Sequence, residues 1–191
     1  MEAELYTMSK KYTQQLNPLI FEAVDKLVDF VKVTYGPAQN KIILQKGRFQ
    51  EVIDDGVTTA KEFELDDEFE NAVINLVKEV AVKTNDRVGD GTTSSLIMLQ
   101  ALMKEIQSVC PDAPARYVIK ELKKGFEDFK TQITARAKQI TTEGELKQVA
   151  YISFNNEKIA EVIAKIFFEL GHEGIVTIEE SRSMETTHNI V

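Results

Sequence analysis

The stretch Val88-Gly89-Asp90-Gly91-Thr92-Thr93-Ser94-Ser95 interrupts two strongly helical patterns with two glycines, one carboxylate and four consecutive hydroxyls. Gly89 and Gly91 allow the backbone to turn sharply and to approach a ligand without an intervening Cβ. The hydroxyls fall in the first turn of the next helix, where free N–H groups and the positive end of the helix dipole favour an anion. Asp90 would repel a bare phosphate, so a hard cation such as Mg²⁺ is needed between the two. The stretch is therefore typical of a site for a Mg-nucleotide.

A purely structural interpretation of the same stretch stays open. Asp, Ser and Thr are common N-cap residues, and Gly is common in turns between helices. The chain contains neither Gly-x-x-x-x-Gly-Lys-Ser/Thr nor a full Gly-x-Gly-x-x-Gly, so neither standard phosphate loop applies. Local chemistry suggests a phosphate site without deciding between it and a capping turn.

Composition limits the classes of function open to these 191 residues. The formal net charge of −8 argues against nucleic-acid binding, which needs Lys and Arg to neutralise phosphates. No apolar segment approaches the ~18 residues of a membrane span, and the start of the chain lacks the pattern of a signal peptide. The single cysteine, Cys110, excludes an internal disulfide and fits a reducing compartment. We expect a cytoplasmic protein that binds neither nucleic acid nor a membrane.

Apolar periodicity predicts a mainly helical chain with one small β-hairpin. A first helix over residues 17–33 ends at Gly36 and Pro37, because glycine can take the cap conformation and proline cannot continue the helix. The helix over residues 96–106 is apolar nearly all round, which predicts that it is buried in a core. The other predicted elements are strands at residues 41–45, 51–53 and 175–178, a long helix from about residue 69, helices at residues 118–140 and 155–170, and a short helical turn at residues 146–150.

A second acidic turn, Asp54-Asp55-Gly56-Val57-Thr58-Thr59, directly follows the predicted hairpin. It repeats the combination of Asp-Gly and threonine hydroxyls. Taken alone, this stretch is explained more simply as a plain turn with a helix N-cap.

Several motifs stand together in the order and spacing of one known family. They are Thr34-Tyr35-Gly36-Pro37, Asp55-Gly56-Val57, Phe69-Glu70-Asn71, Val77-Lys78-Glu79-Val80-Ala81, Asn85-Asp86, Gly89-Asp90-Gly91-Thr92-Thr93, Ile152-Ser153 and Glu173-Gly174-Ile175-Val176-Thr177-Ile178-Glu179. This set resembles the N-terminal part of a group I chaperonin, the GroEL-type ring ATPase. The resemblance covers essentially the whole chain, and Gly-Asp-Gly-Thr-Thr after a long helix is specific to chaperonins.

The resemblance implies a mainly α fold of the α+β class. Residues 1–136 would be the N-terminal half of the equatorial ATP-binding domain, with long helices and a small β-hairpin. Residues 137–191 would be the N-terminal half of the α/β intermediate hinge domain. The chain stops where the family enters its apical, substrate-binding domain, so we expect either a fragment or a naturally truncated protein.

The resemblance also assigns the nucleotide-site residues. Asp90 would coordinate Mg²⁺, and Asp55 would act in catalysis by ordering the attacking water or the metal shell. Positioning and charge neutralisation are the general means of catalysing phosphoryl transfer. The residues expected along ATP are Thr34, Tyr35, Gly36, Pro37, Asp54, Asp90, Gly91, Thr92, Thr93 and Ser94.

The chain departs from the family at several of these positions. The family usually has Lys where this chain has Asp54, so a contact there survives only if it is made through the backbone. Tyr35 replaces a leucine, and Ser94 replaces a third threonine while keeping the hydroxyl. Gln39 and Asn40 replace the family's Gly and Arg. These changes are typical of a divergent member.

Two functions from different classes follow. The first is part of an ATP-dependent ring chaperonin that hydrolyses Mg-ATP to drive protein folding. In its full-length form it would assemble into a homo-oligomeric ring and bind unfolded clients through an apical domain, with a co-chaperonin lid and K⁺ as further candidate partners. The second is a non-enzymatic, truncated module that joins or modulates a chaperonin ring. Retained Asp55 and Asp90 favour the first, while Asp54 and the missing half of the site favour the second.

Overall fold

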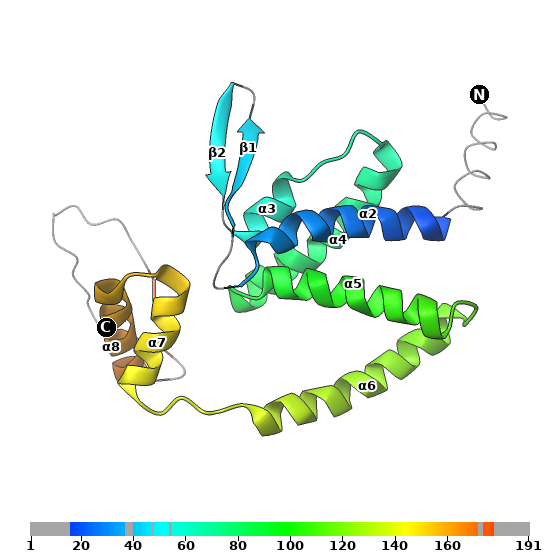
Figure 1. The fold of residues 1–191 in the computed structure, drawn as a ribbon. Helices are drawn as coiled ribbons and strands as arrows, with labels where there is room; N and C mark the ends of the chain where they lie inside the picture. The colour runs from blue at the N-terminus through cyan, green and yellow to red at the C-terminus, as the bar shows by residue number, and fades with distance from the viewer. Residues whose placement is uncertain (1–15, 37–39, 47, 54, 172–173, 178–191) are drawn as a thin grey trace. The chain divides into compact units, whose positions relative to one another are not determined.

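The computed structural model describes residues 16–36, 40–46, 48–53, 55–171 and 174–177. This part of the chain is mainly helical, with one small antiparallel sheet (Figure 1), as the sequence predicts. The elements are α2 (Leu16–Val31), the 3₁₀ turn η1 (Lys32–Thr34), β1 (Ile42–Lys46), β2 (Phe49–Ile53), α3 (Gly56–Glu62), α4 (Glu68–Val88), α5 (Thr92–Val109), α6 (Ala115–Arg136), α7 (Glu143–Phe154) and α8 (Glu157–Leu170). The chain divides into two compact units, residues 1–120 and 121–191, and the division falls within α6.

The core of the first unit forms around α2. This helix buries one continuous stripe of apolar side chains at helical spacing, and α3, α4 and α5 pack against it. Leu27, Ile74 and Leu96 are the largest apolar side chains that this core buries completely. The buried members are Ala23, Val24, Leu27, Val28 and Val31 of α2, Ala60 of α3, Ile74, Val77 and Ala81 of α4, and Leu96 of α5.

The hairpin of β1 and β2 extends away from this core (Figure 1). Its register pairs Ile42 with Ile53 and Lys46 with Phe49. Ile53 is buried at the end nearest the helices, while Phe49 is largely exposed. A two-stranded sheet is only marginally stable alone, so this end anchors the hairpin.

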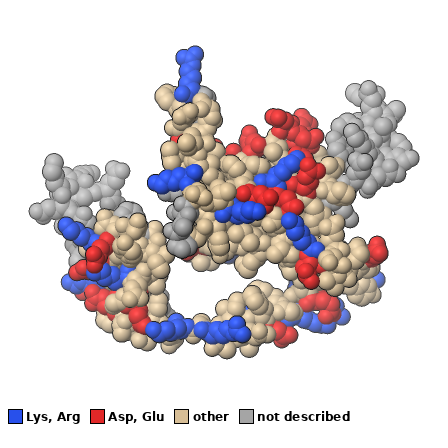
Figure 2. Space-filling view, in the orientation of Figure 1, with Lys and Arg blue, Asp and Glu red and all other residues tan. Residues whose placement is uncertain are grey.

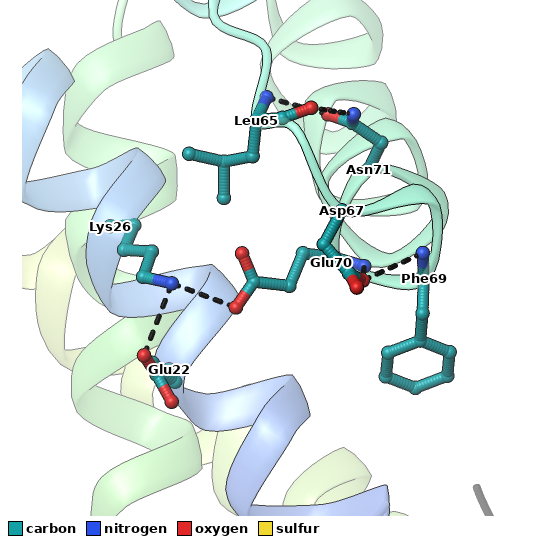
Figure 3. Close-up of polar contacts among 7 residues, drawn as sticks. All are labelled: Glu22, Lys26, Leu65, Asp67, Phe69, Glu70 and Asn71. Atoms are coloured by element: carbon teal, nitrogen blue, oxygen red, sulfur yellow. Dashed lines mark hydrogen bonds and ion pairs between the residues drawn. The ribbon is translucent and has the colours of Figure 1, made fainter.

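The loop between α3 and α4 is fixed by side chains from the first turn of α4 (Figure 3). Asp67 caps α4 by accepting hydrogen bonds from the N–H groups of Phe69 and Glu70, both at 2.9 Å. The amide of Asn71 binds both the N–H and the C=O of Leu65. The Glu70 carboxylate pairs with Lys26 of α2 at 2.7 Å. The loop is therefore held by the first turn of α4, which is itself joined to α2.

In the second unit α7 and α8 pack against each other. Ala160 and Ala164 are buried on α8, and Lys147 of α7 pairs with two glutamates of α8. A strand was expected at residues 175–178. That expectation was wrong over residues 175–177, which form no strand, and residue 178 lies outside the described part. The two helices cover each other only in part, since α8 fully buries just its two alanines, and Ile152 of α7 and Phe168 of α8 stay 83% and 52% exposed.

The predicted burial of the helix after the central turn was also wrong. Of the apolar residues of α5, only Leu96 is fully enclosed, and Met98 is 57% exposed. The helix α6 buries none of its residues, and its Phe126 is 60% exposed. A helix that is apolar all round needs cover on every side. The neighbours of α5, mainly α2 and α4, leave Met98 and Leu102 exposed.

None of the helices in the described part combines the length and the apolar character needed to cross a bilayer.

Candidate functional site

The central turn links two helices through three residues, Gly89, Asp90 and Gly91. Gly89 ends α4 with its N–H bound to Asn85 O at 2.8 Å. Gly89 and Gly91 have φ values of +79° and +80°, a conformation that residues with a Cβ rarely adopt. Both glycines are therefore needed for α5 to start directly after α4.

The N-terminus of α5 has no side-chain cap, although a carboxylate and four hydroxyls surround it. The first bond within the helix runs from Ser95 N to Gly91 O at 2.9 Å, so the N–H groups of residues 92–94 precede it. Asp90 Oδ1 accepts a hydrogen bond from Gly91 N at 2.6 Å and caps none of these groups. Asp90 is exposed, and its other oxygen has no partner among the described residues. This end of α5 thus offers an anion its backbone N–H groups and the positive end of its dipole.

The hydroxyls of α5 point to different surroundings. Thr92 and Thr93 are only 8% and 9% exposed, whereas Ser94 is half-buried. Ser95 donates its hydroxyl to Thr92 O at 2.7 Å. Gly56, at the start of α3, is buried directly against the Thr92 and Thr93 side chains. The two turns that carry Asp-Gly are therefore in contact in the fold.

At the second turn the carboxylate does cap its helix. Asp55 Oδ2 accepts hydrogen bonds from the N–H of Thr58 at 2.8 Å and from its hydroxyl at 2.7 Å. Thr59 donates its hydroxyl to Asp55 O at 2.7 Å. The structural interpretation is correct for this residue, but Asp55 Oδ1 has no partner in the described part of the chain and the residue is exposed.

The predicted segment Thr34–Pro37 begins in η1, which contacts α5. Thr34 is buried and donates its hydroxyl to Val31 O at 2.8 Å, so that hydroxyl is occupied within its own turn. Tyr35 is exposed, and Gly36 has a φ of +88°. Pro37 and Asp54 lie outside the described residues.

This donor set fits a Mg-nucleotide. An exposed carboxylate stands beside an uncapped helix N-terminus and hydroxyls, which is the combination that a hard cation and its phosphate require. No cluster of three or more His, Cys, Asp or Glu side chains suited to a metal forms among the described residues. A Mg²⁺ ion needs only one or two carboxylates when phosphate oxygens complete its shell.

Two polar contacts that the sequence analysis did not predict hold the helices around the site. Lys78 of α4 is buried and donates its Nζ to Lys61 O at the end of α3, at 2.9 Å, and burial lowers the pKa of this amine. Asp25 of α2 accepts from Gln100 at 2.6 Å and pairs with Lys104 at 2.8 Å, which joins α2 to α5. Neither contact has a local sequence signal, since the partners are far apart in the chain.

Acidic and basic side chains are interspersed over α2 and the loop between α3 and α4 on the face shown in Figure 2. The ion pair of Lys26 with Glu70 and Glu22 belongs to this region, and both carboxylates raise the pKa of the Lys26 amine. The Lys26–Glu70 pair joins the first turn of α4 to α2.

A comparison with protein families decides the relationship of the chain. The model of the TCP-1/cpn60 chaperonin family matches residues 27–189. The chain belongs to this family. The chaperonin match contains every predicted site residue, including the turns at Asp55 and Asp90.

Solved chaperonin structures share the fold. The chaperonin gp146 from the bacteriophage EL (Pseudomonas aeruginosa), crystallised in the presence of ATP-BeFx, superposes with TM-scores of 0.70 and 0.67 in two crystal forms. Sequence identity is 24% and 25%, and the match covers 80% of this chain. The chain spans 28% of the length of gp146.

Proposed function

We propose that the chain forms one side of a Mg-ATP site in a chaperonin-type ATPase whose turnover drives protein folding. The observation that carries this proposal is the N-terminus of α5, which lacks a side-chain cap despite the capping residues around it. The N-cap position is held by Gly91, which has no side chain to cap with, and Asp90 does not replace it. Here the N–H groups of the first turn remain available to a ligand.

The proposed roles follow from the chemistry of each group. When bound, Mg²⁺ would neutralise phosphate charge. Asp90 would hold the cation through its second carboxylate oxygen, and the N–H groups and hydroxyls of Thr92, Thr93 and Ser94 would donate to phosphate oxygens. The segment Thr34 to Pro37 and residue Asp54 would line the nucleotide, as in the family.

Asp55 would combine a structural and a catalytic role. Its Oδ2 caps α3, which fixes the side chain, while Oδ1 could accept a hydrogen bond from the attacking water. A carboxylate whose orientation is fixed by one oxygen can position a water with the other.

The wider activity is also a proposal, because the chain spans 28% of the relative gp146. In this proposal the full-length protein assembles into a homo-oligomeric ring and binds unfolded client proteins. A co-chaperonin lid would close the ring, and K⁺ would be an additional cation. Both crystal forms of gp146 were obtained in the presence of ATP-BeFx, which supports nucleotide binding for that protein.

A second candidate function rests on α6. Its exposed apolar side chains, Phe126, Phe129 and Ile133, recur at helical spacing and buried partners for them are absent from the described residues. Such a face favours a module that joins a chaperonin ring without hydrolysing ATP.

Magnesium removal tests the first proposal. Titration calorimetry of the protein with Mg-ATP, and with ATP in excess EDTA, should show binding that weakens at least tenfold without the cation, because Asp90 and the phosphates then repel each other. Equal affinity in both conditions would contradict the proposal.

The second function predicts a different result. The double variant Phe126→Asp with Phe129→Asp should no longer co-sediment with a chaperonin ring, whereas Asp90→Ala should co-sediment unchanged.

A further inference from the structure

The first turns of α3 and α5 meet at a residue without a side chain. A Cβ built on Gly56 would overlap Thr93 Oγ1 and would lie 3.1 Å from Thr92 Oγ1 and 3.4 Å from Thr93 Cβ. Of these, only the 3.4 Å separation is an ordinary van der Waals distance. The backbone of α3 therefore approaches the α5 hydroxyls more closely than any other residue type would allow.

Backbone conformation does not require glycine at this position. Gly56 is the first residue of α3 and does not have a positive φ, unlike Gly89 and Gly91. Any residue with a Cβ could adopt this helical conformation. The requirement for glycine at position 56 is thus a requirement for space against α5.

This contact sets the place of Asp55. The carboxylate caps the same turn that Gly56 begins, and the Thr59 hydroxyl binds Asp55 O, so Asp55 and the first turn of α3 form one hydrogen-bonded piece. Gly56 is the point at which that piece contacts Thr92 and Thr93.

We propose that Gly56 is a positioning residue that sets the separation between the Asp55 carboxylate and the phosphate-binding turn of α5. The inference rests on the proposed function. A Cβ at position 56 moves α3 and Asp55 away from α5, while the N–H groups of α5 stay in place. Because catalysis is sensitive to displacements of about 1 Å, hydrolysis suffers more than nucleotide binding.

A mutant cycle between positions 56 and 93 tests this proposal in the full-length protein. Gly56→Ala should lower kcat at least tenfold and raise the Kd for Mg-ATP less than threefold. Thr93→Ala removes Oγ1 and leaves a Cβ at an ordinary distance, whereas Thr93→Val keeps an atom in place of Oγ1. Adding Gly56→Ala should therefore change kcat less than twofold in the Thr93→Ala background and again about tenfold in the Thr93→Val background.

Equal effects of Gly56→Ala in the two backgrounds would overturn the inference, as would a lowered Tm with unchanged kcat per folded molecule. If Gly56→Ala alone does not fold, the double variant Gly56→Ala with Thr93→Ala is used in its place. Folding of the double variant supports the contact, and its kcat relative to that of Thr93→Ala decides the positioning role. The Tm of the same cycle without nucleotide reports the contact by itself. Failure of the proposed Mg-ATP site has a different readout, because Asp90→Ala would then leave turnover unchanged.

Discussion

The turns at Asp55 and Asp90 have nearly the same sequence but use their carboxylates differently. Both read Asp-Gly followed within two residues by adjacent threonines. Asp55 is itself the N-cap of α3, with extended backbone and a side chain bound to Thr58 N. Gly91 takes that position before α5, with φ of +80°, so Asp90 lies one residue outside the helix. Asp55 and Asp90 thus differ by one position relative to the start of the helix that follows. Asp55 therefore caps its helix, whereas Asp90 stands beside a helix end that has no side-chain cap.

This difference has an energetic consequence. Truncating a capping side chain costs stability, whereas truncating Asp90 removes one hydrogen bond in an exposed turn, from Gly91 N, and the interactions with a ligand. The two turns can therefore be separated by measuring activity and stability on the same variants.

The largest effect is expected at Asp90. Asp90→Ala should reduce Mg-dependent ATP turnover by at least about 100-fold, since a carboxylate ligand of the cation is lost. Stability should change by only about 0.5 kcal/mol, because no helix loses a cap. ATPase assays and calorimetric melting check both.

Asp67→Ala is the matched control for Asp90→Ala. Asp67 caps α4 through two N–H groups, so its loss should cost about 0.5–2 kcal/mol and leave turnover per folded molecule unchanged. If Asp90→Ala behaved like Asp67→Ala, the nucleotide site would be wrongly placed.

At Asp55 both the rate of hydrolysis and the stability should change, and two substitutions can separate the two effects. Asp55→Ala should slow hydrolysis about 100-fold and lower stability by about 0.5–2 kcal/mol, with ATP binding largely intact. Asp55→Asn should restore stability, because asparagine caps as well as aspartate, but should leave hydrolysis slow. Single-turnover rates with denaturant unfolding measure the two effects. Restoration of hydrolysis by asparagine would show that Asp55 only caps α3.

A smaller effect is expected from the hydroxyls. Thr92→Val and Thr93→Val should each weaken Mg-ATP binding by about 3- to 10-fold, the value of one net hydrogen bond, since the backbone N–H groups remain. Thr84→Val on α4 is the control, because the Thr84 hydroxyl binds Val80 O within its own helix. Affinities from calorimetry that are equal for all three variants would contradict a phosphate contact.

The smallest effect concerns a carboxylate that has only a structural role. Glu145 accepts from Thr141 N and Thr142 Oγ1 while Thr142 caps α7, and Lys138 lies 2.6 Å away. Lys138, followed by the Thr141 N–H, lowers the pKa of Glu145 from 4.5 to about 2. Because the folded pKa is the lower one, the stabilisation is complete above about pH 4.5 and disappears as the pH falls toward 2.

The Tm difference between the parent chain and Glu145→Gln should therefore be constant from pH 7 to about 5 and shrink below pH 4.5. Turnover at pH 7 per folded molecule should not change. A Tm difference independent of pH would contradict this account and remove Glu145 as the reference for a purely structural acid.

Much of the fold could be predicted from local pattern. The apolar stripes of α2 and α8 and the two short strands of the hairpin each lie within a single segment, so the local sequence was sufficient to predict them. The helix α7 was predicted only as a short turn at residues 146–150, although Thr142 and Glu145 form a capping box that marks its start.

The candidate site was less accessible to local reasoning. The sequence marked Asp90 and Asp55 as candidate site residues. It could not tell which of the two caps a helix, because the difference is a single position of the helix start. The contact of Gly56 with Thr93 and the bond of Lys78 to Lys61 O join distant segments. Such contacts depend on how the helices pack, and periodicity carries no information about them.

The three-residue link between α4 and α5 makes helical phase a property of the site. Both helices pack on α2, so the link has no slack to absorb a change in length. Ala81 is the last buried residue of α4. One residue inserted between Ala81 and Gly89 would rotate the end of the helix by about 100°, so Asp90 would point in a different direction. An insertion of seven residues would restore the direction of Asp90 about the helix axis but would move the turn by about 10 Å along that axis. Descendants of this sequence can therefore exchange side chains along the exposed face of α4 more freely than they can gain or lose a single residue in it.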